Sequence, residues 1–168
     1  MSGQSLLIVL RVVHIVLGVF WAGSAAMLGW FIMPSLRAAG AGGPPFVQEL
    51  MDVRKLSMWL AIASGLAILS GLAMYARFAM YSQGSFASSR PGMIYGIGAV
   101  TAIIAAILGG GVSGRAGRRI AALASLGPPS ESVRAEIAEL NARAMRATQW
   151  AAALLVITAL AMAVARYV

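Results

Sequence analysis

The sequence predicts an all-α membrane protein in which four transmembrane helices form a bundle. Three observations support this fold class. Of the 168 residues, 60% are hydrophobic and a further 19 are glycine, well above the roughly 45–50% apolar share of a soluble domain. Only 11% are charged, and most of these lie between apolar runs rather than inside them. Four runs are long enough for a bilayer crossing, which takes about 20 residues: 6–33, 56–75, 92–112 and 148–164.

We therefore expect residues 1–168 to form a single integral membrane domain in the lipid bilayer. The run 6–33 is interrupted only by Arg11 and His14, and at about 1.5 Å per residue it exceeds a hydrocarbon layer of roughly 30 Å. It must tilt or protrude. No Lys or Arg precedes Leu6, which argues against a cleaved signal peptide. The net charge of +8 is typical of basic membrane-protein loops, so we expect no nucleic-acid partner.

The basic residues predict the orientation, because Lys and Arg accumulate in cytoplasmic loops. Segments 34–55 and 113–147 hold nine of them, and the other side holds three, or four with Arg11. Both segments should then lie in the cytoplasm and both termini outside, in a bacterial inner membrane. The aromatic residues agree with this assignment, since such rings favour both interfaces. Trp59 and Trp150 fall at the cytoplasmic ends of spans, and Tyr75, Tyr81, Tyr95 and Tyr167 at the outer ends.

Residues 113–147 predict a cytoplasmic helical hairpin that extends the third and fourth spans. Gly127 and the two prolines after it end the first arm, and Ser130 is a suitable N-cap for the second. Glu139 and Arg143 have the spacing of a helical ion pair. The alternative is that both arms lie flat on anionic lipid. Complementary apolar stripes favour the hairpin: Val112, Ala116, Ile120, Leu123 and Leu126 on one arm, and Val133, Ile137, Leu140 and Ala144 on the other.

The first cytoplasmic loop repeats this plan on a smaller scale. A Gly- and Pro-rich break at 40–45 is followed by apolar residues at helical spacing that lead into the second span, namely Phe46, Leu50, Val53 and Leu56. This similarity suggests an old duplication, although the pattern is also a common way to build a hairpin.

Small residues recur at four-residue intervals and predict close helix packing. In lipid, the hydrophobic effect does not drive helices together, so their association depends on close backbone approach and van der Waals packing. The same faces could serve a homo-oligomer or a partner in a membrane complex. The positions are Gly18, Ala22 and Ala26; Ala61 and Gly65; Gly92 and Gly96; and Ala102, Ala106 and Gly110.

Two ionisable residues lie inside a predicted span, where such residues are costly and mark candidate functional sites. Arg11 and His14 are three residues apart and share a helix face, which Gly18 and Trp21 continue. A neutral imidazole can bind iron or copper, so His14 is a candidate metal ligand. Arg11 could pair with a haem propionate, and Gly18 would leave room for a flat macrocycle. We therefore predict a possible haem b site at these four residues.

Arg11 and His14 can also be explained by structural roles alone, without a cofactor. Arg11 can extend to the lipid headgroups, and His14 can hydrogen-bond a carbonyl or hydroxyl of a neighbouring helix, such as Ser64, Ser70 or Thr101. Since His14 is the only histidine, bis-histidine haem within one chain is excluded. Haem would need a five-coordinate iron, a methionine ligand or a partner chain.

Other features bear on the class of function. Ten methionines, with Met74, Met80 and Met93 near the outer side, suggest copper handling, although methionine is also an ordinary core filler. There is no cysteine, P-loop, nucleophile elbow or dinucleotide fingerprint. Asp and Glu are absent from the four runs, which argues against a carboxylate proton relay or a cation-coupled transporter. No catalytic residue is predicted, and a non-catalytic accessory or assembly subunit is the alternative to a redox protein.

The first span also carries a specific spacing of residues. It contains Arg11 and His14, then after six residues Trp21 and Gly23, and later Met33-Pro34 and Arg37. This pattern resembles the opening helix of the copper resistance protein D-like group of small four-helix bacterial membrane proteins, which includes the HemJ-like protoporphyrinogen oxidases. The further histidine expected after the proline is missing, and other small members of the group match better than the oxidases. The resemblance implies that His14 is a haem ligand, with quinone-linked oxidation chemistry.

Overall fold

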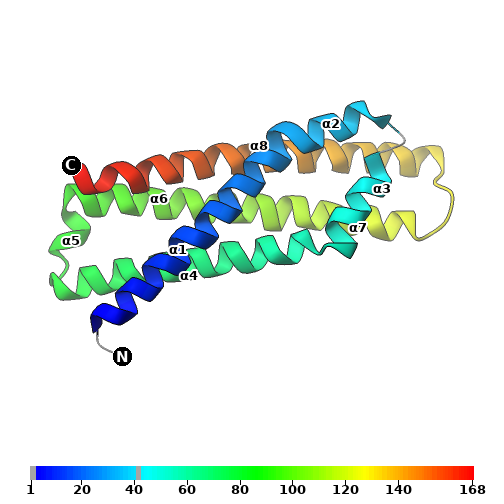
Figure 1. Cartoon of the computed structure of the whole chain (residues 1–168). Helices are drawn as coiled ribbons and strands as arrows, with labels where there is room; N and C mark the ends of the chain where they lie inside the picture. Colours follow the sequence, from blue (N-terminus) through cyan, green and yellow to red (C-terminus); the bar gives the residue numbers. More distant parts are fainter. Residues whose placement is uncertain (1–2, 41–42) are drawn as a thin grey trace.

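The described part of the chain folds into four long helices, which run back and forth (Figure 1). A computed structural model describes residues 3–40 and 43–168 and shows no strand within those ranges. Four of its helices are long and apolar enough to cross a membrane, which confirms the predicted all-α class: Gly3–Ala38, Leu56–Tyr81, Arg90–Ala124 and Glu131–Tyr167.

Several of the long helices are built from consecutive segments. The first consists of α1 (Gly3–Ala26), the π-helical segment η1 (Met27–Ile32) and α2 (Met33–Ala38). The third consists of α6 (Arg90–Ala106), the π-helical η4 (Ile107–Ser113) and α7 (Gly114–Ala124). The fourth is α8 (Glu131–Val164) with a terminal 3₁₀ turn, η5 (Ala165–Tyr167). The remaining elements are α3 (Gly43–Gln48), the π-helical η3 (Glu49–Val53), α4 (Leu56–Tyr81) and α5 (Ser85–Ser88).

The helices form two closely packed pairs. α1 packs mainly on α4, α6 packs mainly on α8, and α1 also touches α8. Figure 1 shows α4, α6 and α8 side by side with α1 crossing them diagonally. The start of α1, α5 and the end of α8 lie at one end of the bundle, and the α7–α8 turn lies at the other. We call these the α5 end and the hairpin end.

The core of the bundle is small and consists mostly of alanine. Alanine side chains allow the close backbone approach that membrane helices use for packing. Polar contacts also join the third and fourth long helices. Thr101 Oγ1 of α6 lies 2.8 Å from Thr158 Oγ1 of α8, and Ser113 Oγ of η4 donates to the Ala144 carbonyl of α8 at 3.1 Å. The core residues are Trp21, Ala25, Ala63, Ala67, Ala102, Ala105, Ala151, Ala152 and Leu155.

The predicted small-residue faces are only partly correct. Ala102 is in the core, and Ala22, Ala26 and Ala106 pack against it. At Gly18, Gly65 and Gly110 the assignment is wrong, because a Cβ added there would meet nothing within 4 Å. Gly92 is buried, as predicted. The second span uses Ala63 and Ala67 instead of Ala61 and Gly65. A helix with several small faces does not reveal from spacing alone which face packs.

The hairpin forms as predicted from α7 and the first half of α8. Gly127 turns the chain with φ +103°, and Ser130 Oγ caps α8 by accepting the Val133 N–H at 3.3 Å. Leu123 is only 5% exposed, and Ala116 and Ala144 are also buried. α7 and α8 pack against each other, as the hairpin requires.

Two expectations for the loops are wrong. Glu139 and Arg143 form no ion pair, and the hairpin is instead crossed by Arg119 Nε and Glu136 Oε1 at 2.8 Å. The apolar stripe of the first loop does not run continuously into the second span, because Lys55 adopts a left-handed conformation with φ 53° and separates η3 from α4. α4 also continues beyond the predicted boundary at residue 75, as far as Tyr81.

Candidate functional site

His14 joins α1 to α4 through a hydrogen bond to the backbone. Its Nδ1 lies 2.7 Å from the carbonyl oxygen of Ala67. A carbonyl only accepts, so Nδ1 carries the proton. The same oxygen accepts a second hydrogen bond from Ser70 Oγ at 3.1 Å. The structural interpretation is thus correct in kind, but the acceptor is Ala67 rather than Ser64, Ser70 or Thr101.

Gly71 provides the surface on which the imidazole rests. A Cβ at this position would lie 2.7 Å from His14 Cε1 and 2.9 Å from Nδ1. Any larger residue would therefore displace the ring. The sequence reasoning missed Gly71, although Ala63, Ala67 and Gly71 form a four-residue repeat of small residues on one helix face. That repeat is the signal that identifies the face of α4 toward α1.

The other ring nitrogen of His14 has no hydrogen-bond partner among the residues that the structure describes. With the proton on Nδ1, a neutral imidazole carries an available lone pair on Nε2. A histidine whose second nitrogen ligates a metal is commonly oriented by such an Nδ1–H bond to a backbone carbonyl. The contact to Ala67 therefore fits both a packing role and a ligand role.

The remaining candidates have different surroundings. Arg11 is exposed and makes no ion pair or hydrogen bond with any described residue. Gly18 is half-buried and has open space where a side chain would project. Trp21 is 8% exposed and packs in the core, so its ring is part of the bundle interior. The four residues thus extend from the surface of α1 into the core, and their cofactor role stays a prediction.

A metal site built only from protein side chains finds no support in the described ranges. They contain no group of three His, Cys, Asp or Glu residues that could hold an ion. Of the methionines considered for copper, Met80 is 78% and Met93 is 52% exposed. Copper handling stays a prediction on sequence grounds.

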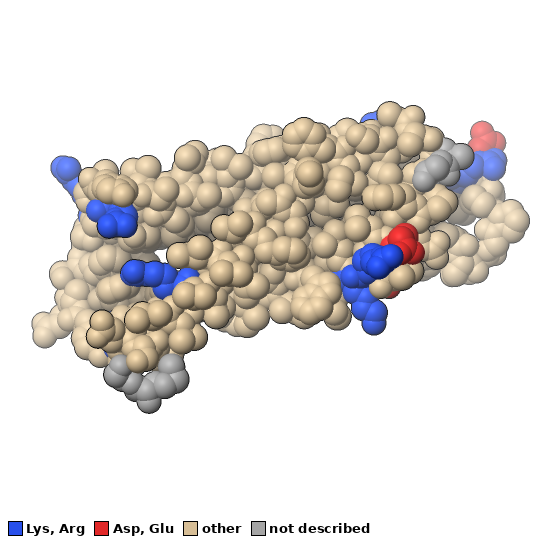
Figure 2. Space-filling model, in the orientation of Figure 1, with Lys and Arg blue, Asp and Glu red and all other residues tan. Residues whose placement is uncertain are grey.

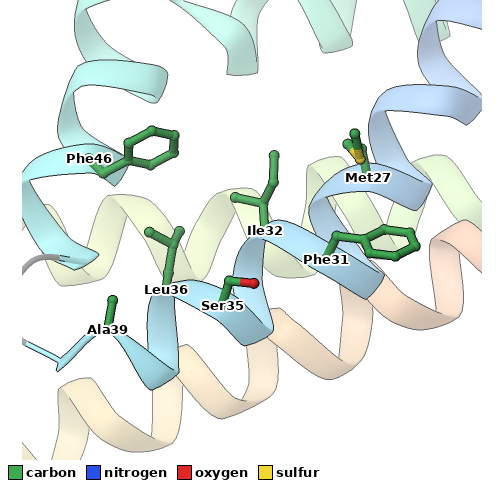
Figure 3. A pocket seen from close by; sticks show the side chains of 7 residues that line it. All are labelled: Met27, Phe31, Ile32, Ser35, Leu36, Ala39 and Phe46. Atoms are coloured by element: carbon green, nitrogen blue, oxygen red, sulfur yellow. The ribbon is translucent and has the colours of Figure 1, made fainter.

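Two shallow grooves lie on the surface of the described residues away from the predicted site, since His14 and Arg11 line neither of them. One, of about 350 Å³, lies between η1–α2 and Phe46 of α3 (Figure 3). Ser35 is the only residue with a polar side chain in its lining, which also includes Met27, Phe31, Ile32, Leu36 and Ala39. The other, of about 410 Å³, lies on the last turns of α4.

A comparison with known protein families, curated proteins and solved structures gives no match for this chain. Function is therefore argued from the residues themselves.

Proposed function

We propose that this integral membrane protein binds b-type haem through Nε2 of His14 and serves a redox role. The observation that carries the proposal is the 2.7 Å hydrogen bond from Nδ1 to the Ala67 carbonyl, which fixes the ring and leaves Nε2 with an available lone pair. Haem suits a site with one histidine because the porphyrin supplies four of the iron ligands. Bound haem would supply one-electron chemistry, with its potential set by axial ligation and burial.

Two neighbouring features support haem over a bare ion. Arg11, one helical turn from His14, has no acidic partner among the described residues, and an arginine is suited to pair with a propionate carboxylate. Gly18, one turn beyond His14 in the other direction, leaves open space on α1. Besides His14, the iron would be held by water, a methionine or a second copy of the chain. The resemblance of the first span to the copper resistance protein D-like group supports the same role for His14.

Optical absorption tests the proposal directly. The protein is expressed with a haem supply, purified in detergent, and its Soret band is compared with that of His14→Ala. We expect a band in the wild-type protein that the substitution abolishes. A wild-type protein that folds but carries no haem would refute the proposal, as would a band that His14→Ala leaves intact.

A matched pair of glycine substitutions tests the geometry of the ring. Gly71→Ala places a methyl group against the imidazole, whereas Gly65→Ala, on the same helix, meets nothing within 4 Å. Haem occupancy should fall with Gly71→Ala and stay unchanged with Gly65→Ala. Equal effects of the two variants would indicate that the ring position on α4 does not matter for binding.

The hairpin favours a second candidate, an accessory or assembly subunit of a membrane complex. Arg119 is paired with Glu136, but the other arginines of the hairpin make no ion pair within the described ranges: Arg115, Arg118, Arg134, Arg143 and Arg146. A cationic surface beyond the membrane is suited to an acidic protein partner. Reversing Arg134 and Arg143 to Glu should release a stable co-purifying partner, while His14→Ala should not.

A further inference from the structure

The groove at the α5 end of α4 combines apolar walls with one cation. It has a volume of about 410 Å³ and is lined by Ala73, Ala76, Arg77, Met80 and Tyr81. These residues belong to the last turns of a helix that is long and apolar enough to cross a membrane. The groove therefore lies on the surface of this helix, close to one of its ends.

Arg77 is held in place from two sides. Its Cζ lies 4.8 Å from the centre of the Tyr81 ring, a cation–π contact. On the α1 side, a Cβ at Gly3 would lie 2.5 Å from Arg77 Nη2, so the guanidinium rests against a residue that has no side chain. Its Nε is buried and has no hydrogen-bond partner among the described residues. A buried donor without a partner is costly, so the described fold leaves this arginine incompletely satisfied.

No acidic side chain lies near enough in the fold to neutralise Arg77. The five acidic residues are Glu49, Asp52, Glu131, Glu136 and Glu139, all in η3 or the first part of α8, toward the hairpin end. Figure 2 shows acidic atoms only toward that end of the visible face, while basic atoms occur at both ends. Carboxylates at the hairpin end do pair with arginines, as in Arg54–Glu49 at 2.9 Å. The α5 end is therefore cationic, since Arg90 begins α6 and Arg166 lies in η5, and both of these positions are at that end of the bundle (Figure 1).

We propose that this groove binds an anionic phospholipid. The phosphodiester accepts hydrogen bonds from the guanidinium of Arg77, and an acyl chain lies along Ala73, Ala76 and Met80. Arginine is suited to this because its planar guanidinium offers several donors to one phosphate. The apolar walls favour a lipid over a free phosphate ion, which would gain nothing from them.

Native mass spectrometry of the full chain in detergent tests the proposal by counting bound lipids. Phosphatidylglycerol and phosphatidylcholine of equal chain length are titrated separately. We expect the wild-type protein to bind phosphatidylglycerol about tenfold more tightly than phosphatidylcholine, since tenfold is the effect of about one charge-assisted hydrogen bond. Inorganic phosphate at the same concentration should not displace it. Equal binding of the two lipids, or displacement by phosphate alone, would overturn the proposal.

Three variants locate the site. Arg77→Gln should lose the preference for phosphatidylglycerol. Arg166→Gln is the matched control, because Arg166 also stacks on a tyrosine, with its Cζ 5.2 Å from the Tyr167 ring centre, but does not line the groove. Ala76→Trp keeps the charge and fills the groove, so it should weaken binding without changing Arg77. Equal losses in Arg77→Gln and Arg166→Gln would show a diffuse charge effect instead of a site. If Arg77→Gln does not fold, Ala76→Trp decides, since unchanged binding there contradicts the groove.

Discussion

Replacing Leu123 by alanine tests whether packing between α7 and α8 stabilises the hairpin. Leu123 is 5% exposed and belongs to α7, which packs on α8. Truncating a buried leucine to alanine costs about 2–5 kcal/mol, depending on how far the site collapses around the cavity. Two helices can close such a gap more easily than a large core can, so we expect the low end of that range, about 2 kcal/mol.

Hydrogen–deuterium exchange of the α7 amides is the suitable assay, because it reports local opening without unfolding the membrane-embedded part. At about 1.4 kcal/mol per factor of ten, the expected loss corresponds to exchange that is about 30-fold faster in Gly114–Ala124. The control is Leu126→Ala, a substitution of the same residue type three positions later, where the side chain is 82% exposed. It should change exchange by less than about twofold, as surface substitutions usually do.

The comparison of the two leucines can refute the packing. Equal acceleration in both variants would mean that Leu123 is no more protected than Leu126, as expected for arms lying flat on lipid. Unchanged exchange in Leu123→Ala would show that its contacts with α8 contribute nothing to the stability of the hairpin.

Three further predictions concern other parts of the chain. His14→Ala should lower the free energy of unfolding by about 0.6–2 kcal/mol, measured by denaturant titration in detergent. The loss is small because interhelical hydrogen bonds in membranes are modest and the Ala67 carbonyl still accepts from Ser70. A loss several times larger would show that the ring does more than bridge two helices. Gly92→Ala should destabilise the protein by about 1–3 kcal/mol or more, because a Cβ there would overlap the Phe86 carbonyl. Gly96→Ala should be neutral or slightly stabilising, because the nearest atom to its Cβ would be 3.8 Å away. Similar thermal stability of the two variants would contradict the tight α5–α6 turn. A reporter enzyme that works only outside the cytoplasm should be active when fused to the C-terminus, as the distribution of basic residues predicts, and activity of a cytoplasmic reporter there would reverse the orientation.

The features that the sequence predicted correctly depend on local chemistry. The α7–α8 turn follows from Gly127 and Ser130, because the N-cap hydrogen bond reaches only three residues along the chain. The four long helices follow from runs of apolar residues, which are a property of each segment by itself. Such features require no knowledge of how the helices cross.

The features that were missed depend on how the helices are rotated against each other. The acceptor for His14 is a backbone carbonyl, which every residue of α4 possesses, so the sequence carries no mark of Ala67. The ion pair formed by Glu136 connects two arms of the hairpin, and a helical spacing rule can only suggest partners on the same helix. Lys55 takes a left-handed conformation that sequence rules assign first to Gly or Asn.

The triple glycine Gly109-Gly110-Gly111 lies inside the π-helical segment η4, and this has a consequence for insertions and deletions. A π turn contains one residue more than an α turn, and each residue of an α-helix advances the side chains by about 100° around the axis. Deleting one of these glycines can convert the wide turn to a regular one and leave the angular phase of α7 unchanged. The same deletion within α6 would rotate everything after it and turn the apolar side of α7 away from α8. The segment is therefore the place where evolution can change the length of this helix by a single residue without changing its partner.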